Sequence, residues 1–313
     1  MSLFALRASP EFLPPMAKGK IPSYPEFLSP RTTREPERSF DQWLELGVGL
    51  ASHQYGADWQ EAFETGGVQG FVWRGPGGTS ETLLSGLLFP SCDSVGRRYP
   101  LAVAIGVPRA LVAHAPHVLP LAFGDFLERA HAATADFGEL QPADLVARLA
   151  TLGPPSEHDV VSAIADYDAW CQSTRPEEAW SAIFEDGDPG RALPILYALG
   201  SATEAVRGVE QPASGVSLRL PLGRGGPASA TLWLDVIRRL SRWTRTVPTT
   251  FWAVNQGSLV VSLGDAPPGV LSALWYQGSE HVYDLTVPPT AATEGSVLSA
   301  GSRMSDLLAS LGY

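Results

Sequence analysis

The sequence predicts an α/β protein: a layered sandwich with a mixed central sheet flanked by helices, plus a smaller α/β second unit. Apolar runs of strand length cluster in the first and last thirds of the 313 residues. Helical spacing of apolar residues dominates the part between them. The chain also contains 31 glycines and 27 prolines, which predicts many short elements joined by turns.

Two arrangements fit this distribution of strands: two separate units, or one sheet that gathers strands from both ends of the chain. We favour two units, because 313 residues are enough for two modest domains. The expected segments are a poorly ordered N-terminus at 1–17, an N-terminal α/β domain at 18–140, a second unit at 155–285, and a linker-like tail at 286–313 that ends in a short helix.

The first unit begins with a predicted helix over residues 40–53. Ser39 and Gln42 have the spacing of a capping box at its start. A second short helix is expected around Trp59 and Phe63. Three strands follow in the runs FVWR (71–74), TLLSGLLF (82–89) and PLAVAIGV (100–107), and a helix is expected over 119–130.

Residues 142–208 have helical periodicity, and Ser156 with Asp159 forms a second candidate capping box. A period of two from Val216 to Leu220 predicts a half-buried strand, with Ser217 and Arg219 on the polar side. An amphipathic helix (233–243), a hairpin (249–263) and a helix from the prolines at 267–268 complete the unit.

Composition narrows the class of partner. The net charge of −11 and a pI near 5.0 argue against a nucleic acid or an anionic membrane, because charge repulsion would oppose binding. Only Cys92 and Cys171 are present, which fits a reducing compartment. No apolar stretch free of prolines is long enough to span a bilayer, so we expect a cytoplasmic protein without membrane insertion.

Common catalytic and cofactor motifs are missing from the sequence, including the phosphate loop, GxGxxG, GxSxG and HExxH. The glycine-rich stretch at 223–226 has no lysine for a phosphate. His114 and His117 stand three apart but have no neighbouring ligand, and Asp186 and Asp188 are typical of a turn. We therefore expect no metal and no cofactor.

The stretch LLFPSCDSVGRRYPL, residues 87–101, places a polar cluster between two predicted strands. A hydrolase could use Ser91, Cys92, Asp93 and Arg97 with a distant histidine, and Arg97 could lower the pKa of the Cys92 thiol. The structural alternative is that Cys92 fills space and Asp93 accepts backbone N–H bonds in the turn. On residue chemistry alone we favour the structural role.

Three segments in this order resemble the TagF/ImpM family of bacterial type VI secretion accessory proteins. These are GKIPSYPEF (19–27), the tryptophan-bearing FDQWLELGVGLA (40–51) and GLLFPSCDSVGRRYPL (86–101). The first segment departs from the family pattern, because Pro25-Glu26 stands where relatives have glycine-aspartate. Family-motif residues with an expected structural or partner-binding role are Gly19, Lys20, Pro22, Glu26, Phe27, Trp43, Pro90, Ser91, Asp93, Gly96, Arg97, Tyr99 and Pro100.

The resemblance implies a three-layer α/β fold and a role other than catalysis. It implies a cytoplasmic, post-translational negative regulator of type VI secretion that acts by protein–protein binding, with a forkhead-associated scaffold as the suspected partner. Two alternatives to this regulator stay open: the hydrolase described above, and a structural assembly subunit of the secretion apparatus.

Overall fold

The computed structural model describes residues 12–28, 34–254, 257–287 and 303–311. Its centre is one eight-stranded sheet with the strand order β1-β4-β3-β2-β6-β7-β5-β8. The strands are β1 (Leu13–Lys18), β2 (Gln69–Trp73), β3 (Thr82–Phe89), β4 (Leu101–Pro108), β5 (Ser217–Pro221), β6 (Thr249–Ala253), β7 (Ser258–Ser262) and β8 (Tyr283–Asp284).

The sheet is mixed, as the sequence predicts. Its neighbours pair antiparallel except β5 and β8, which run parallel. Strands β2, β3 and β4 come from the expected N-terminal domain and β5 to β8 from the expected second unit, whereas β1 lies almost wholly in the segment 1–17 that precedes the expected domain. The two groups join through β2 and β6, where Phe71 lies opposite Phe251. The sheet therefore gathers strands from both ends of the chain, and the two expected units correspond to its two halves.

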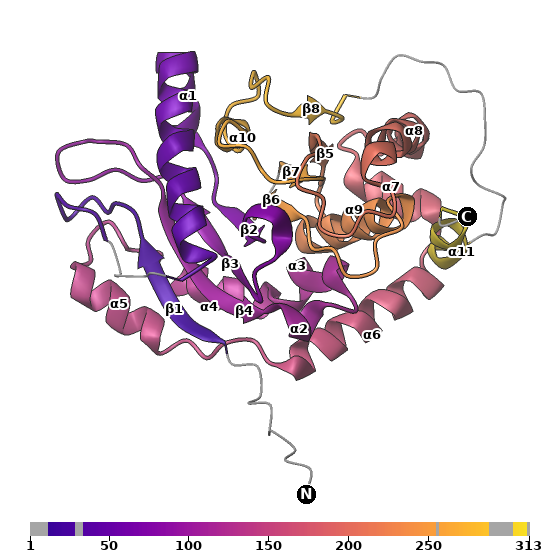
Figure 1. The fold of residues 1–313 in the computed structure, drawn as a ribbon, viewed down its shortest axis with the longest axis horizontal. Helices are drawn as coiled ribbons and strands as arrows, with labels where there is room; N and C mark the ends of the chain where they lie inside the picture. Colours follow the sequence, from indigo (N-terminus) through magenta and orange to yellow (C-terminus); the bar gives the residue numbers. More distant parts are fainter. Residues whose placement is uncertain (1–11, 29–33, 255–256, 288–302, 312–313) are drawn as a thin grey trace, which may run out of the picture.

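Helices cover both faces of the sheet in a three-layer arrangement (Figure 1). One face carries α1 (Glu37–Thr65) and α10 (Val270–Ala273). The other face carries α2 (Arg109–Val112), α3 (Leu119–Ala122), α4 (Gly124–Ala133), α5 (Pro142–Ala150), α6 (Glu157–Ser173), α7 (Pro176–Ile183), α8 (Ala192–Thr203), α9 (Gly226–Leu240) and α11 (Met304–Ser310).

Each layer interface has its own apolar core. Alternate strand residues point to opposite faces, so Phe71 packs toward α1 while its neighbour Val72 packs toward the larger helical layer. The α1 side is aromatic, and Trp43 stacks on Phe251 with ring centroids 5.1 Å apart. These two cores account for the continuous apolar runs in β3 and β4, whose residues are buried on both faces.

The predicted helices at 40–53 and around Trp59 are one element, α1, with a kink at Gly56 (φ 53°, ψ −123°). The expected capping box at Ser39 is wrong. The helix starts earlier, at Glu37 after Pro36, so Ser39 lies in its first turn and donates to the Pro36 carbonyl at 2.9 Å. The second expected capping box is confirmed, because Ser156 and Asp159 cap α6 reciprocally.

The expected disorder of residues 1–17 is wrong for residues 13–17, which belong to edge strand β1; residues 1–11 lie outside the described part. Pro14 and Pro15 lie at an irregularity in the pairing with β4, between Leu13 and Met16. No backbone N–H is needed there for a hydrogen bond to β4, and prolines have none. A proline pair is therefore compatible with an edge strand here. The C-terminal helix is confirmed as α11, and the linker-like residues 288–302 lie outside the described part.

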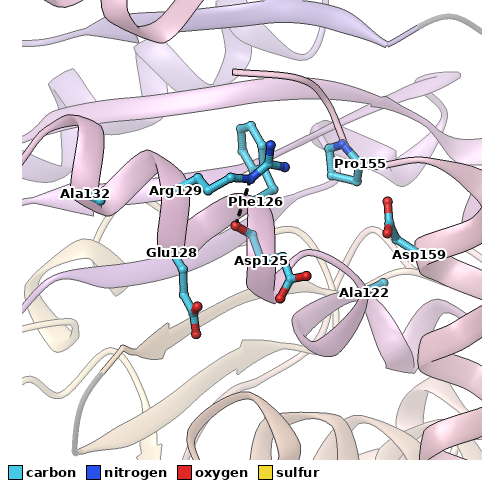
Figure 2. A pocket seen from close by; sticks show the side chains of 8 residues that line it. All are labelled: Ala122, Asp125, Phe126, Glu128, Arg129, Ala132, Pro155 and Asp159. Atoms are coloured by element: carbon cyan, nitrogen blue, oxygen red, sulfur yellow. Dashed lines mark hydrogen bonds between the residues drawn. The ribbon is translucent and has the colours of Figure 1, made fainter. Parts of the chain in front are cut away.

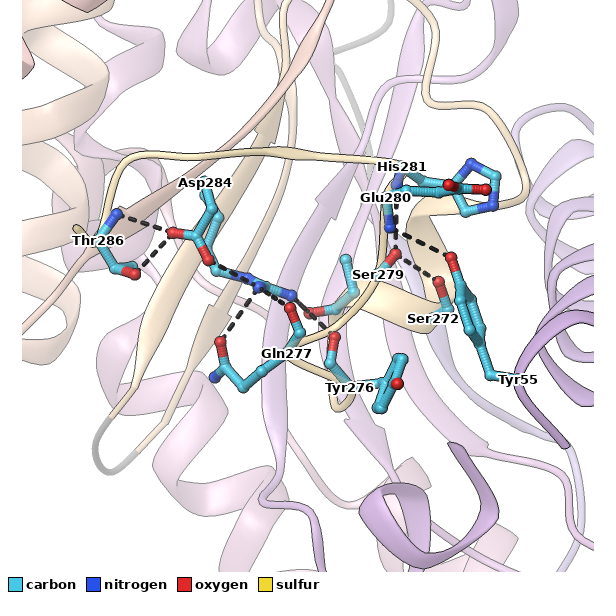
Figure 3. A network of polar contacts seen from close by, with 11 residues as sticks. Tyr55, Ser272, Tyr276, Gln277, Ser279, Glu280, His281, Asp284 and Thr286 are labelled. Atoms are coloured by element: carbon cyan, nitrogen blue, oxygen red, sulfur yellow. Dashed lines mark hydrogen bonds and ion pairs between the residues drawn. The ribbon is translucent and has the colours of Figure 1, made fainter. Parts of the chain in front are cut away.

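Strand β5 differs from the half-buried strand that the alternation predicted. Arg219 is fully buried because α10 and the chain after it cover the face toward which it points. Its guanidinium donates to the carbonyl oxygens of Ala273 (2.7 Å) and Tyr276 (3.0 Å) and pairs with Asp284 at 3.0 Å. Figure 3 shows this network, in which Thr286 also donates to the Asp284 carboxylate.

None of the helices in the described residues combines the length and the apolar character that crossing a bilayer requires.

Candidate functional site

The two main family motifs meet at one end of the sheet. Residues 19–28 follow β1, and residues 90–100 connect β3 to β4, the strand that pairs with β1. Gly19 allows this meeting, because a Cβ at this position would lie only 2.0 Å from the Pro100 carbonyl oxygen. Its φ of 125° is also a conformation that favours glycine. Gly19 and Leu28 then close the first loop with two backbone hydrogen bonds of 3.0 and 2.8 Å.

Asp93 organises the second loop from within. Its Oδ1 accepts hydrogen bonds from the backbone N–H of Val95 at 3.1 Å and of Arg97 at 2.8 Å. Its backbone N–H donates to the Arg97 carbonyl at 3.1 Å, and the turn closes at Gly96, whose φ of 84° favours glycine. The prediction that Asp93 accepts backbone N–H bonds in this turn is therefore confirmed.

Lys20 and Asp93 form a buried ion pair between the motifs. The Lys20 ammonium donates to Asp93 Oδ2, and the two side chains are 4% and 0% exposed. Arg97 Nε donates to the same oxygen at 2.6 Å from a largely exposed position. A buried carboxylate is costly unless it is paired and hydrogen-bonded, and Asp93 has both forms of compensation.

This environment determines the charge state of Asp93. Burial by itself would raise the pKa of the carboxyl group, but the hydrogen bonds from Lys20, the two backbone amides and Arg97 outweigh it and hold the pKa well below its usual range. Asp93 is thus ionised throughout the physiological range. Burial also raises the pKa of the nearby Tyr99 phenol, with help from the charges of Asp41 and Glu45.

Three further hydrogen bonds connect the loops. Ser91 Oγ donates to the Lys20 carbonyl at 2.7 Å, and Ser94 N–H donates to the Tyr24 carbonyl at 3.3 Å. Arg97 Nη2 donates to the Pro25 carbonyl at 2.6 Å. Pro25, which departs from the family pattern, therefore contributes its backbone carbonyl to the contact between the loops. The polar atoms of the two loops form most of their hydrogen bonds with each other.

The outer surface of the joined loops has a different character. Phe27 is 47% exposed and Val95 is 67% exposed. The Phe27 ring is held from below by the Lys20 ammonium, 4.5 Å from its centroid, and from the side by the edge of Tyr99 at 4.9 Å. Pro22, Glu26 and Arg97, which belong to the same two loops, are exposed as well. We call Phe27 and Val95 the apolar tip.

The remaining motif residues serve the fold. Trp43 lies away from the tip, buried in the α1 core, and its Nε1–H donates to the Pro267 carbonyl at 3.1 Å. Cys92 is half-buried and pairs with Arg98 as an isolated β-bridge. Pro90 is half-buried at the end of β3. No histidine in the described ranges hydrogen-bonds to Ser91, Cys92 or Asp93.

The two histidines of the sequence analysis are separated by the fold. His114 is exposed, whereas His117 packs edge-on against Tyr167 with ring centroids 5.5 Å apart. Burial lowers the pKa of His117 to about 4, against the attraction of Asp235. Sequence reasoning missed the cluster around Asp235, a buried carboxylate that pairs with Arg238 and Arg239 on its own helix.

The other weak candidates have structural explanations. Residues 223–226 pack against the end of α7, where Arg224 N–H donates to the Ala182 carbonyl at 3.2 Å. Asp186 and Asp188 cap a turn and Asp186 pairs with Arg191 at 3.0 Å. Within the described ranges, the structure has no group of three or more aspartate, glutamate, histidine or cysteine side chains that could hold a metal ion.

A hollow of about 410 Å³ between α4 and the start of α6 contains three carboxylates (Figure 2). The Asp159 carboxylate caps α6, because its Oδ2 accepts a hydrogen bond from the Ser156 backbone N–H at 2.6 Å. Arg129 spans the hollow and donates to the carbonyl oxygens of Asp125 and Gly153, each at 3.3 Å. The hollow contains no residue of the family motifs.

The fold and this junction define a three-layer α/β protein in which two sequence motifs build one buried ion pair beneath an apolar tip. Residues 17–152 match the family described as the TagF N-terminal domain, Type VI secretion system-associated. These residues contain both motifs. The match confirms, over residues 17–152, the resemblance to the TagF family that the sequence shows.

A search of curated proteins found no match to the chain. Among solved structures the chain is similar to the crystal structure of PA0076 from Pseudomonas aeruginosa PAO1, with 16% sequence identity and a TM-score of 0.48. The similarity covers 86% of this chain and 97% of that chain. The domain match over residues 17–152 supports an accessory role in type VI secretion.

Proposed function

We propose that the protein is a non-enzymatic, cytoplasmic regulator that restrains type VI secretion after translation by binding another protein of the system. The observation that carries the proposal is the junction of the two motifs. Their polar residues are used inside the fold, while their outer surface presents Phe27 and Val95 to solvent. Exposed aromatic and apolar side chains on a rigid support are suited to protein binding.

The hydrolase alternative would need Ser91, Cys92 and Asp93 to be free for chemistry. The Ser91 hydroxyl instead donates to the Lys20 carbonyl, and the Asp93 carboxylate is occupied by Lys20, Arg97 and two amides. A nucleophile also needs a base within hydrogen-bond reach. These commitments favour binding over catalysis.

The proposed partner is the forkhead-associated scaffold that the TagF resemblance implies. The direct test is calorimetric titration of the full chain with the forkhead-associated component from the same genome, together with secretion assays in a deletion strain. We expect saturable binding and increased secretion on deletion. Absence of binding with unchanged secretion would contradict the proposal.

The secretion assay, combined with copurification, also distinguishes a regulator from a structural subunit. Stoichiometric copurification with the assembled secretion apparatus, and loss of secretion on deletion, would indicate a structural subunit. A regulator should be dispensable for secretion and act substoichiometrically.

A further inference from the structure

Helix α8 has a composition that is unusual for a helix at the surface. Its sequence, ALPILYALGSAT, contains no charged residue over residues 192–203. Ile195 and Leu199 are fully buried on its inner face, whereas Tyr197 is 57% exposed. Among the helices of eight or more residues in the described ranges, α8 alone lacks a charged side chain. A surface helix normally has a charged or polar outer face, so α8 has the character of a helix that another element covers.

A hollow of about 700 Å³ lies along this helix. The large apolar side chains that line it are Leu193, Leu196, Tyr197, Leu240 and Leu311. Gly200 and Ser201 line it as well, and a Cβ at Gly200 would meet no heavy atom within 4 Å. A largely exposed aromatic ring thus lies beside a part of the helix that another backbone can approach closely.

The charge of the lining restricts what can occupy the hollow. Its two charged residues, Glu204 and Arg207, pair with each other at 3.0 Å, so the lining is neutral. An occupant that brought an unpaired charge would bury it against leucines, at a high cost in desolvation. The contact face of the occupant is therefore apolar and uncharged. Within the described part of this chain, the outer face of α8 itself meets that requirement.

We propose that two copies of the chain associate through α8, packed antiparallel about a two-fold axis. Such an axis brings the same patch of both copies together, so the Tyr197 ring of each copy enters the hollow of the other beside Gly200. Antiparallel packing also places the positive N-terminal end of each helix dipole near the negative C-terminal end of the other.

The net charge of −11 opposes association of two copies in general. Physiological salt screens exposed charges beyond about 8 Å, however, and the lining of the hollow brings no unpaired charge into the contact. The hollow lies outside residues 17–152 and far from β1 in Figure 1. The inference therefore goes beyond the proposed function and does not depend on it.

Sedimentation velocity of the full chain over a wide range of concentration tests the proposal. We expect a monomer–dimer equilibrium, which Gly200→Gln should weaken about tenfold because the new side chain blocks the close approach of the helices. In the monomer the same side chain enters open space and replaces a poor helix former, so the melting temperature at low concentration should be unchanged or higher. Tyr197→Ala should also weaken the dimer about tenfold. The matched control Val161→Gln, at a position 53% exposed on α6, should leave the dimer unchanged.

Charges of both signs at one position provide the second arm. Ser201→Glu and Ser201→Lys should each abolish the dimer, because the two-fold axis brings like charges together. An equimolar mixture of the two variants should dimerise again, since opposite charges then meet. A chain that stays monomeric at every concentration would overturn the proposal and leave the hollow to a helix of another protein. A dimer that ignores Gly200→Gln and Tyr197→Ala, or a mixture that stays monomeric, would overturn it as well.

Discussion

Lys20 and Asp93, 73 positions apart in the sequence, form an ion pair in which the side chains are 4% and 0% exposed. Each residue belongs to a different family motif, so the pair joins the motifs physically. The same ammonium lies 4.5 Å from the centre of the Phe27 ring. One buried contact thus connects the internal polar network to the apolar tip, and the predictions for Lys20, Asp93 and the tip depend on that connection.

Removal of Lys20 should destabilise the fold. In Lys20→Met the Asp93 carboxylate stays buried and keeps Arg97 as its one charged partner. We expect the free energy of unfolding to fall by about 3 kcal/mol, near the lower end of the cost of breaking a buried ion pair. Lys18→Met is the matched control, because Lys18 pairs with the more exposed Asp41. Its cost should be below about 1 kcal/mol. Urea unfolding measures both, and equal losses would contradict a special role for Lys20.

The contribution of Asp93 should depend on pH in a defined direction. Its pKa is lowered in the folded state, so the stabilisation is present above the unfolded value and is lost as the pH falls through the acidic range. Asp93→Asn should therefore melt well below the wild type at neutral pH, and the gap should narrow below about pH 4. A constant gap from pH 7 to pH 3 would show that the charge of Asp93 does not stabilise the fold.

His117 should produce a second, separate pH effect. Its pKa falls from 6.5 to about 4 on folding, mainly through burial, so the unfolded chain binds more protons between these values. Stability should therefore decline as the pH falls from 6.5 to 4, by roughly 3 kcal/mol at most. Arg238 and Arg239 also lower this pKa, and Asp235 opposes them.

The comparison with His117→Gln isolates the effect of His117 together with its coupling to Asp235, because the charge of His117 also lowers the pKa of that carboxyl group. The variant should have a flatter stability profile between pH 6.5 and 5. Parallel profiles for the two proteins would mean that His117 is not buried in its neutral form.

Arg219 should hold the segment after α10 against the sheet. Arg219→Met removes the donors to the Ala273 and Tyr276 carbonyls and the partner of Asp284. We expect faster amide hydrogen exchange over residues 276–286 and little change in β3 or β4. Arg224→Met, at an exposed position, is the control. Unchanged exchange in the variant would show that apolar contacts alone fix this segment.

Local patterns in the sequence predict most elements because local physics determines them. The Ser156–Asp159 cap and the strands β2, β3 and β4 follow from capping chemistry and apolar runs. The pairing of β2 with β6 joins residues about 180 positions apart, and nothing in either strand specifies its neighbour. For this reason the sequence suggested two units where the sheet is continuous.

Buried charges were the other features that sequence reasoning missed. An arginine in an alternating strand, such as Arg219, predicts a solvated face, and only the position of α10 reverses this. Asp93 was assigned correctly to its turn, because aspartate often accepts local amide bonds. Its partner Lys20 could not be predicted from spacing, since the contact depends on how β1 pairs with β4.

The most direct test of the account is to measure partner binding and melting together. The full chain, the Phe27→Ala/Val95→Ala double variant and Arg97→Ala would be titrated calorimetrically with the forkhead-associated component, and each melting temperature recorded. We predict that the double variant melts like the wild type and loses most of its affinity. Arg97→Ala should lose stability first and affinity only secondarily. The opposite pattern, with binding intact in the double variant and lost in a normally melting Arg97→Ala, would contradict the division between a structural interior and an apolar contact surface.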